Sequence, residues 1–228
     1  MILVTGGTGL VGAHLLFFLL RKGNRVRAIH RTNSNLLAVK DVFSYYMENP
    51  DLLYQKIEWV EANLNDIPAL TEAFHGIDKV YHTAAYVSFD PKNFNKLRKS
   101  NIEGTANIIN LCLYFKIKKL CYMSSIATLG EGENFKFITE KSVWNPDEKN
   151  SVYAITKYGA EMEVWRGVQE GLNAVIMNAG VILGSGFWKS GTGAIFSKVY
   201  KGLNYYTNGE TGFVDVRDVV KICTSLME

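Results

Sequence analysis

The stretch Thr5-Gly6-Gly7-Thr8-Gly9-Leu10-Val11-Gly12 lies between two short apolar runs, Ile2–Val4 and Leu15–Leu20. A glycine-rich turn between a strand and a helix is typical of a dinucleotide-binding site. Gly6 permits a tight turn, Gly9 lets a pyrophosphate approach the backbone, and Gly12 lets the helix pack closely on the strand. The helix N-terminus would then present free N–H groups to the phosphates; the alternative is a plain tight turn. We expect these residues of the turn to bind the cofactor: Gly6, Thr8, Gly9, Leu10, Val11 and Gly12.

Apolar runs alternate with segments of helical length along the rest of the chain. The runs expected to form strands are Ile2–Val4, Val26–Ile29, Ile57–Val60, Lys79–Thr83, Leu120–Met123 and Ala174–Met177. The clearest helical segments are His14–Arg21, Ile67–Phe74, Ile102–Phe115 and Tyr153–Gln169. This alternation predicts an α/β fold of Rossmann type, with a doubly wound parallel sheet and helices on both faces. We place the dinucleotide-binding domain at residues 1–178 and a partial, small substrate-binding region at residues 179–228.

Composition narrows the class of protein further. Of the 228 residues, 47% are hydrophobic and 21% are charged, and the formal net charge is +3. This bias is too weak to indicate a nucleic-acid or membrane partner, and Leu15–Leu20 is far shorter than the ~20 residues of a membrane span. Cys112, Cys121 and Cys223 form no CxxC or Cys/His cluster. We therefore expect no metal site and no disulfide, but reduced thiols in a cytoplasmic protein.

The choice of cofactor depends on residues at the end of the second strand, about 20 residues after the glycine turn. An acid there would bond the ribose 2′-hydroxyl of NAD, but this chain has His30-Arg31. A guanidinium suits a 2′-phosphate. These residues therefore favour NADP, with NAD as the second candidate; the alternative is that Arg31 is a solvated surface charge.

Tyr153 and Lys157 lie four residues apart in a segment of helical pattern, so their side chains share one helix face. A nearby ammonium lowers the pKa of a phenol from its usual ~10 and lets it exchange a proton with a substrate oxygen. Ser124-Ser125 follows the strand Leu120–Met123, at the sheet edge where ligands bind. Taken singly, the Tyr–Lys pair could lie on a solvated helix and the serines could cap a turn. Together they predict a reaction centre.

Two histidines have simpler interpretations. His14 follows the glycine turn, and we expect it to lie on the helix surface or to pack. His82 ends a strand and is expected to be a core histidine with satisfied hydrogen bonds rather than a base.

The ordered motifs together resemble the extended short-chain dehydrogenase/reductase family. They are TGGTGLVG (Thr5–Gly12), HTAA (His82–Ala85), NIEGT (Asn101–Thr105), SSIATLG (Ser124–Gly130), YAITK (Tyr153–Lys157), GVILG (Gly180–Gly184) and FVDVRDV (Phe213–Val219).

This resemblance implies a role for each matching residue. Tyr153 would be the general acid/base, and Lys157 would bond the nicotinamide ribose and tune Tyr153. Ser125 would orient the substrate oxygen, with Ser124 as the near neighbour, and Asn101 would support the site. Further cofactor residues implied are Asn63, Leu64, Thr83, Ala84, Ala85, Gly180 and Ile182, besides Tyr153 and Lys157. The chain departs from the family at Asn63, where an acid is frequent, and at Ala179, where proline is frequent.

Within the family, HTAAYVSF at His82–Phe89 is more similar to dihydroflavonol reductases, cinnamoyl-CoA reductases and 3β-hydroxysteroid dehydrogenases than to sugar-nucleotide epimerases. This implies an NADPH-dependent oxidoreductase of a small carbonyl or alcohol. The alternatives are a nucleotide-sugar epimerase or dehydratase, and a non-catalytic dinucleotide sensor. The family also implies a homodimer through Ile102–Phe115 and Tyr153–Gln169. Family members usually continue well beyond FVDVRDV, so we expect either a fragment of a longer protein or a minimal substrate lobe.

Overall fold

The computed structural model describes residues 1–130, 138–202, 204–205, 208 and 211–228. Its centre is a parallel six-stranded sheet in the order β3-β2-β1-β4-β5-β6. The strands are β1 (Ile2–Thr5), β2 (Val26–His30), β3 (Ile57–Glu61), β4 (Lys79–His82), β5 (Lys119–Met123) and β6 (Ala174–Met177). Each expected strand forms, and its ends differ from the expected ones by no more than one residue. Strand order reverses between β1 and β4, which is where ligands bind in such sheets.

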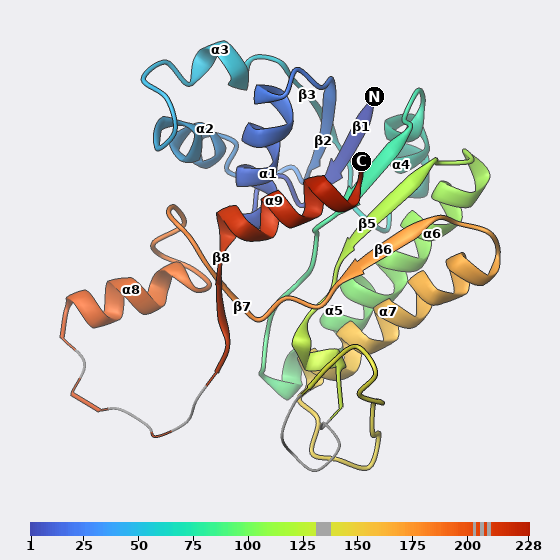
Figure 1. The fold of residues 1–228 in the computed structure, drawn as a ribbon, viewed down its shortest axis with the longest axis vertical. Coiled ribbons are helices and arrows are strands. Elements are labelled where there is room, and N and C mark those ends of the chain that lie inside the picture. Colours follow the sequence, from blue (N-terminus) through green and yellow to red (C-terminus); the bar gives the residue numbers. More distant parts are fainter. Residues whose placement is uncertain (131–137, 203, 206–207, 209–210) are drawn as a thin grey trace.

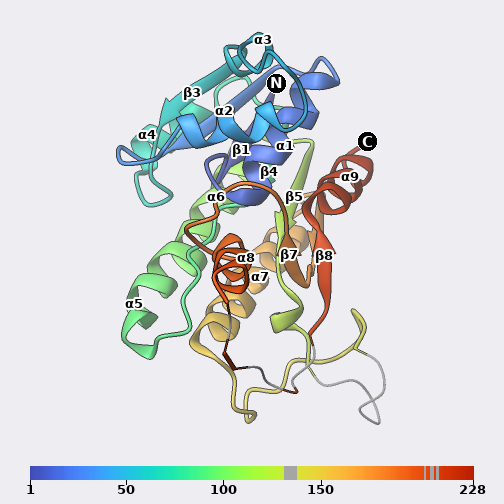
Figure 2. The same cartoon turned by 90° about the vertical axis from the view of Figure 1, so that its left-hand side faces the viewer.

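Helices cover both faces of this sheet (Figures 1 and 2). One apolar core contains side chains of α1 (Leu10–Arg21), α2 (Leu37–Ser44) and α9 (Val216–Leu226). A second core contains side chains of α4 (Ile67–Phe74), α6 (Gly104–Tyr114) and α7 (Val152–Gln169). The remaining short helix near the first core is α3 (Asp51–Tyr54). The predicted fold class, a Rossmann-type α/β fold, is confirmed.

Helix α1 is apolar around most of its circumference because it is covered on two sides. Leu15, Leu16 and Leu19 are buried. Helix α9 packs beside α1 on the same face of the sheet, where its Val219 and Val220 share one apolar core with α1 and with Cys121 of β5. A helix hydrophobic all round is typical of such a buried position.

The segment before α6 begins earlier than its sequence pattern predicts. A 3₁₀ turn, η1 (Pro91–Asn93), leads into α5 (Phe94–Leu97), and a π-helix, η2 (Arg98–Glu103), then joins α5 to α6. The expected helix Ile102–Phe115 therefore has its N-terminus in a continuous helical segment. A π-helical turn inserts one extra residue per turn and is frequent at functional sites.

The described residues after β6 form a small second sheet and two helices. Strands β7 (Val181–Leu183) and β8 (Phe213–Asp215) pair in parallel, and α8 (Gly193–Tyr200) stands away from the main sheet (Figure 1). Helix α9 returns to pack on α1. The predicted boundary between a dinucleotide-binding domain and a substrate-binding region at residue 178 stays a prediction. Helix α9, which follows that boundary, packs on α1 of the dinucleotide-binding domain.

The described residues contain no helix that is both long and apolar enough to cross a membrane. The three cysteines are free and buried. In the same described ranges, no group of His, Cys, Asp and Glu side chains is placed to hold a metal ion.

Candidate active site

The glycine turn brings the start of α1 against the ends of β1 and β4. Gly6 has a φ of +73°, and a Cβ atom there would lie 2.6 Å from the backbone nitrogen of Ala84. A Cβ atom on Gly12 would lie only 2.1 Å from the carbonyl oxygen of Gly6. Gly9 caps the helix, and its N–H donates to the Gly6 carbonyl over 2.9 Å. Only glycine at positions 6 and 12 therefore permits this close approach.

A pocket of about 460 Å³ opens at these strand ends. Ten of the expected cofactor residues line it: Gly6, Thr8, Gly9, His30, Arg31, Asn63, Leu64, Thr83, Ala84 and Ala85. Among the others, Leu10, Val11 and Gly12 form the first turn of α1, Gly180 precedes β7, and Ile182 lies within β7. Tyr153 and Lys157 lie on α7.

The pocket also contains residues that the sequence did not indicate, among them Ser34, Tyr86, Lys96, Lys99 and Ser100. Lys96 comes from α5, and Lys99 and Ser100 come from η2; only the fold brings that segment to the pocket. Tyr86 follows the HTAA motif directly, and this position next to a cofactor motif is a sequence signal for it.

The lining suits a dinucleotide with its phosphates. Three cationic side chains, Arg31, Lys96 and Lys99, line the pocket, and no acid is among the described residues that do so. The first N–H groups of α1 have no partner within the helix, because the first intrahelical bonds start later, so they can bind an anion. The residues present therefore fit a dinucleotide.

Two expected adenosine contacts have local hydrogen bonds of their own. The side-chain oxygen of Asn63 accepts from the N–H of Asn65 over 3.1 Å, which leaves the amide NH₂ for a ligand. Arg31 is exposed, and its backbone N–H donates to the Ser34 hydroxyl over 3.0 Å. The Arg31 side chain is thus available to a 2′-phosphate.

Lys157 is buried at the far end of the site, on α7. Its Nζ donates to the Tyr122 hydroxyl and to the Met123 carbonyl oxygen, each over 2.7 Å. Burial lowers the pKa of Lys157 to about 7, and the attraction of Glu161 opposes this shift. The ammonium is therefore held against β5.

Tyr153 lies one turn before Lys157, near the start of α7, which Ser151 caps by accepting from the Ala154 N–H. Burial raises the pKa of the Tyr153 phenol, and a hydrogen bond with the Ser125 side chain opposes this. That Lys157 tunes the pKa of Tyr153 stays a prediction.

The structure distinguishes the two adjacent serines. The Ser125 side chain faces Tyr153 and also accepts from the Ala127 N–H over 3.2 Å, as the turn-cap alternative predicted. The Ser124 hydroxyl points the other way and donates to Glu161 over 2.5 Å. Ser125 is therefore the serine placed beside Tyr153.

Asn101, in η2, joins the pocket to α7. Its side-chain oxygen accepts from the Tyr86 N–H over 2.8 Å, and its NH₂ donates to the Tyr86 carbonyl over 3.0 Å and to the Thr156 hydroxyl over 3.3 Å. The amide thus holds the backbone after β4 against the helix that carries Tyr153; that Asn101 supports a reaction centre stays a prediction.

His82 lies in the core between two threonines. Its ring nitrogens contact Thr5 Oγ1 over 2.6 Å and Thr105 Oγ1 over 3.0 Å. Burial lowers the pKa of His82 to about 3, so the ring is neutral at physiological pH. His82 is a satisfied core histidine.

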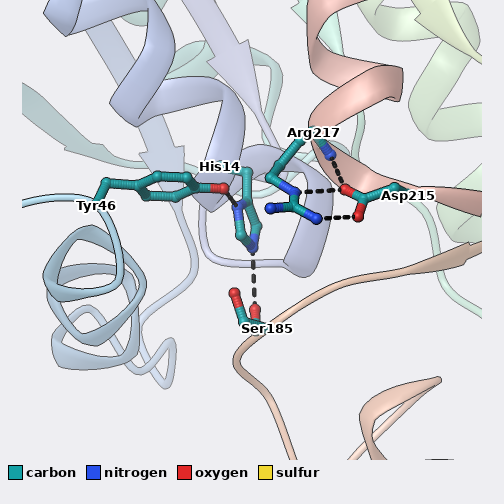
Figure 3. A network of polar contacts seen from close by, with 5 residues as sticks. All are labelled: His14, Tyr46, Ser185, Asp215 and Arg217. Carbon is teal, nitrogen blue, oxygen red and sulfur yellow. Dashed lines mark hydrogen bonds and ion pairs between the residues drawn. The ribbon is translucent and has the colours of Figure 1, made fainter.

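His14 links the Rossmann core to the segment after β7 (Figure 3). It is fully buried; Nδ1 lies 2.5 Å from the Tyr46 hydroxyl, and Nε2 lies 2.9 Å from the Ser185 carbonyl oxygen. An Asp215–Arg217 ion pair lies beside the ring, and burial lowers the pKa of His14. His14 therefore packs and joins elements, and does not lie on the surface.

Comparison with known proteins agrees with this geometry. The family model of the NAD dependent epimerase/dehydratase family matches residues 2–228. A provisionally named dihydroflavonol 4-reductase of Synechocystis sp. is 34% identical over 221 residues, which are 95% of this chain and 60% of that protein. Tetraketide alpha-pyrone reductase 2 of Arabidopsis thaliana is 29% identical over 99% of this chain and 73% of its own length.

A solved structure supports the same assignment. UDP-glucose 4-epimerase of Thermotoga maritima, with UDP-glucose, has a TM-score of 0.80 and 26% identity, over 100% of this chain and 73% of that one. This chain spans less than two thirds of the length of the Synechocystis relative. The family resemblance predicted from the motifs is confirmed. The chain belongs to the NAD-dependent epimerase/dehydratase family of extended short-chain dehydrogenases/reductases.

Proposed function

We propose that this protein is an NADPH-dependent reductase of a small, rather apolar carbonyl compound. In the reverse direction it would oxidise the corresponding alcohol. The observation that carries the proposal is the placement of Ser125 beside Tyr153, one helical turn from Lys157, at the carboxyl ends of the strands. Asn101 connects this centre to the dinucleotide pocket.

The chain's own residues would supply the position and the proton. A bound nicotinamide cofactor supplies the hydride. Burial raises the pKa of Tyr153, so the phenol is protonated at neutral pH and can donate a proton to the substrate oxygen. The Ser125 hydroxyl would hold that oxygen at Tyr153. Lys157 would place a positive charge near the phenolate that remains.

The cofactor would lie along the pocket described above. The glycine turn, with the N–H groups of Leu10, Val11 and Gly12, would hold the pyrophosphate. Asn63 and Leu64 would lie at the adenine, and Gly180 and Ile182 near the nicotinamide. Arg31, without a nearby acid among the described lining residues, favours a 2′-phosphate and hence NADP over NAD.

Two named relatives are reductases, which supports the reductase proposal. The Thermotoga structure is an epimerase, so epimerisation of a nucleotide sugar is the second candidate. A sensor that binds the dinucleotide without catalysis is the third, and the presence of both Tyr153 and Lys157 argues against it.

We also propose a cytoplasmic homodimer formed through α6 and α7. Exposed apolar side chains on these helices support this proposal: Tyr114, Ile155, Met162 and Trp165. Met162→Glu should convert the dimer to a monomer in size-exclusion chromatography with light scattering. Val199→Glu, an exposed change on α8, is the control.

The test of the cofactor is a titration with NADPH and with NADH, followed by nicotinamide fluorescence. We expect tighter binding of NADPH, and we expect Arg31→Gln to weaken NADPH about tenfold or more while leaving NADH unchanged. Arg21→Gln, a change on the exposed end of α1, is the matched control. Equal loss for both cofactors would refute the 2′-phosphate role.

The test of the reaction is a panel of aromatic and aliphatic carbonyl compounds with NADPH. Tyr153→Phe should abolish turnover, because the phenol donates the proton to the substrate oxygen. The affinity for NADPH should stay within about twofold of the wild type. Tightly retained NAD after purification, with epimerisation of UDP-glucose and no net oxidation of NADPH, would favour the epimerase instead.

A further inference from the structure

Glu161 is a buried carboxylate that the proposed reaction does not use. It lies on α7, one turn beyond Lys157, and only 7% of it is exposed. Its Oε2 accepts from Ser124 Oγ over 2.5 Å, from Thr128 Oγ1 over 2.8 Å and from Asn178 Nδ2 over 2.9 Å. A buried carboxylate is costly unless donors satisfy it. Three donors on one oxygen make a charge-assisted cluster.

The three donors come from two neighbouring strand ends. Ser124 follows β5, Thr128 ends the short turn η3 (Ile126–Thr128), and Asn178 follows β6. Glu161 thereby connects α7 to the carboxyl ends of β5 and β6, where ligands bind in such sheets. Side chains from both loops converge on this carboxylate, and two backbone hydrogen bonds, from Ser124 N–H to Met177 O and from Ile126 N–H to Ala179 O, also join them.

Ser125 lies between two of these donors. Its carbonyl oxygen is 2.8 Å from Thr128 Oγ1 and 3.4 Å from Asn178 Nδ2. Residues on both sides of Ser125 are therefore anchored to Glu161. These contacts link the segment around Ser125 to the helix that carries Tyr153 two turns earlier.

Glu161 also supplies the negative charge nearest to Lys157 along α7. The other groups around the ammonium are Tyr122 and Tyr153, whose phenols burial keeps protonated, and His82, which is neutral. The Met123 carbonyl contributes only a dipole. The attraction of Glu161 raises the pKa of Lys157 against the effect of burial.

We propose that Glu161 is a positioning residue of the reaction centre, which holds Ser125 at Tyr153 and compensates the buried charge of Lys157; its role in turnover rests on the proposed function. Charge and anchoring are separable, because Ser124 and Thr128 take part only in the anchoring.

The charge is tested without a substrate. The titration of Lys157 is followed by the ¹³Cε resonance of lysine, assigned by its loss in Lys157→Met; ordinary lysines titrate near 10.4. Glu161→Gln should move the Lys157 midpoint down by about one pH unit or more, as Coulomb's law across one helical turn predicts. Glu170→Gln, at the exposed end of the same helix, should leave it unchanged. A shift below about 0.5 unit in folded Glu161→Gln would overturn the electrostatic role.

The anchoring is tested by hydrogen exchange and by turnover. Ser124→Ala and Thr128→Val keep the Glu161 charge, so the Lys157 midpoint should stay in place. The backbone amides of residues 125–128 should exchange at least about tenfold faster, as the loss of a hydrogen bond to a charged group predicts. For a carbonyl of the panel that the wild type reduces, kcat should fall with an unchanged KM for NADPH.

These outcomes separate the two proposals. If the wild type reduces no carbonyl, the proposed function fails, while the titration and the exchange data still test Glu161. If Glu161→Gln does not fold, Glu161→Asp takes its place: the retained charge should keep the Lys157 midpoint, and the shorter side chain should give fast exchange at Ser125. Slow exchange in that variant and in both donor variants would overturn the anchoring role.

Discussion

Replacement of Gly12 by alanine should push α1 away from the glycine turn. The added Cβ would lie 2.1 Å from the carbonyl oxygen of Gly6, and 2.7 Å from its carbonyl carbon and from Gly7 Cα. Real Cβ atoms essentially never approach other atoms within 3.0 Å. All three neighbours are backbone atoms, so no side chain can rotate out of the way. The helix must therefore move by roughly 1 Å.

The cost can be worked out from this displacement. Alanine in a helix gains at most ~1 kcal/mol over glycine. Overpacking against immovable atoms costs ~1–3 kcal/mol or more. A shift of α1 also loosens Leu15, Leu16 and Leu19 against the sheet and Val219 on α9. We expect a net loss of about 2 kcal/mol in the free energy of unfolding.

The assay is urea unfolding followed by circular dichroism, together with NADPH titration. Gly9→Ala is the matched control, because its Cβ would lie 3.4 Å from the Gly6 carbonyl oxygen, an ordinary contact. Its stability should stay within about 1 kcal/mol of the wild type, since only the helix cap changes. NADPH binding should nevertheless be lost, because Gly9 lines the pocket.

Two results would refute this reasoning. An unchanged midpoint in Gly12→Ala would mean that the close approach of helix and turn is unimportant. Equal destabilisation by Gly9→Ala would mean that Gly9 is needed for the fold, and not for the approach of a ligand.

Three further changes test other parts of the site. Burial lowers the pKa of Lys157 to about 7, so between that pH and the unfolded pKa of ~10.4 the unfolded chain binds more protons, and the contribution of Lys157 to stability should rise with pH from about 7. Lys157→Met should remove this rise in urea unfolding at about pH 7, 8 and 9; the same dependence of stability on pH in wild type and variant would contradict the buried charge. His14→Leu should cost ~2–3 kcal/mol, because it leaves two half-buried partners without this hydrogen bond, and Tyr46→Phe only ~1 kcal/mol, measured by thermal unfolding. Asn101→Asp should cost ~1–3 kcal/mol in urea unfolding, because a carboxylate would face the Tyr86 carbonyl in place of an NH₂ donor; no loss would contradict the bidentate contact.

Much of the fold could be predicted because its signals are local. Strands buried on both faces are continuous apolar runs, and all six were found within one residue at either end. The close approach at Gly12 is also local, since its neighbours Gly6 and Gly7 belong to the same turn, whereas Gly6 meets Thr83 and Ala84, which follow β4. The helical segment that contains α6 begins before Ile102, where its sequence pattern predicts the start, because a π-helix does not follow the period of an α-helix.

The role of Leu15–Leu20 shows where local signals end. A run apolar on every side is ambiguous by itself. Part of its explanation is α9, which lies some 200 residues further along the chain and packs beside α1 on the same face of the sheet. Residues so far apart in sequence come together only through the order of the strands, which periodicity does not encode.

The amino-acid sequence alone indicates the chemical groups of the candidate site: the glycine turn, Ser125, Tyr153 and Lys157. It also shows that no acid stands beside Arg31 at the end of the second strand. Their types and spacing carry that information, because a phosphate cradle and a helix face are local geometries. Only the tertiary structure decides which groups bond to one another. Ser125, and not Ser124, faces Tyr153; Lys157 donates to Tyr122; and Ser124 donates to Glu161. The physical reason is that burial sets these hydrogen bonds and pKa values, and burial depends on elements that are distant in sequence.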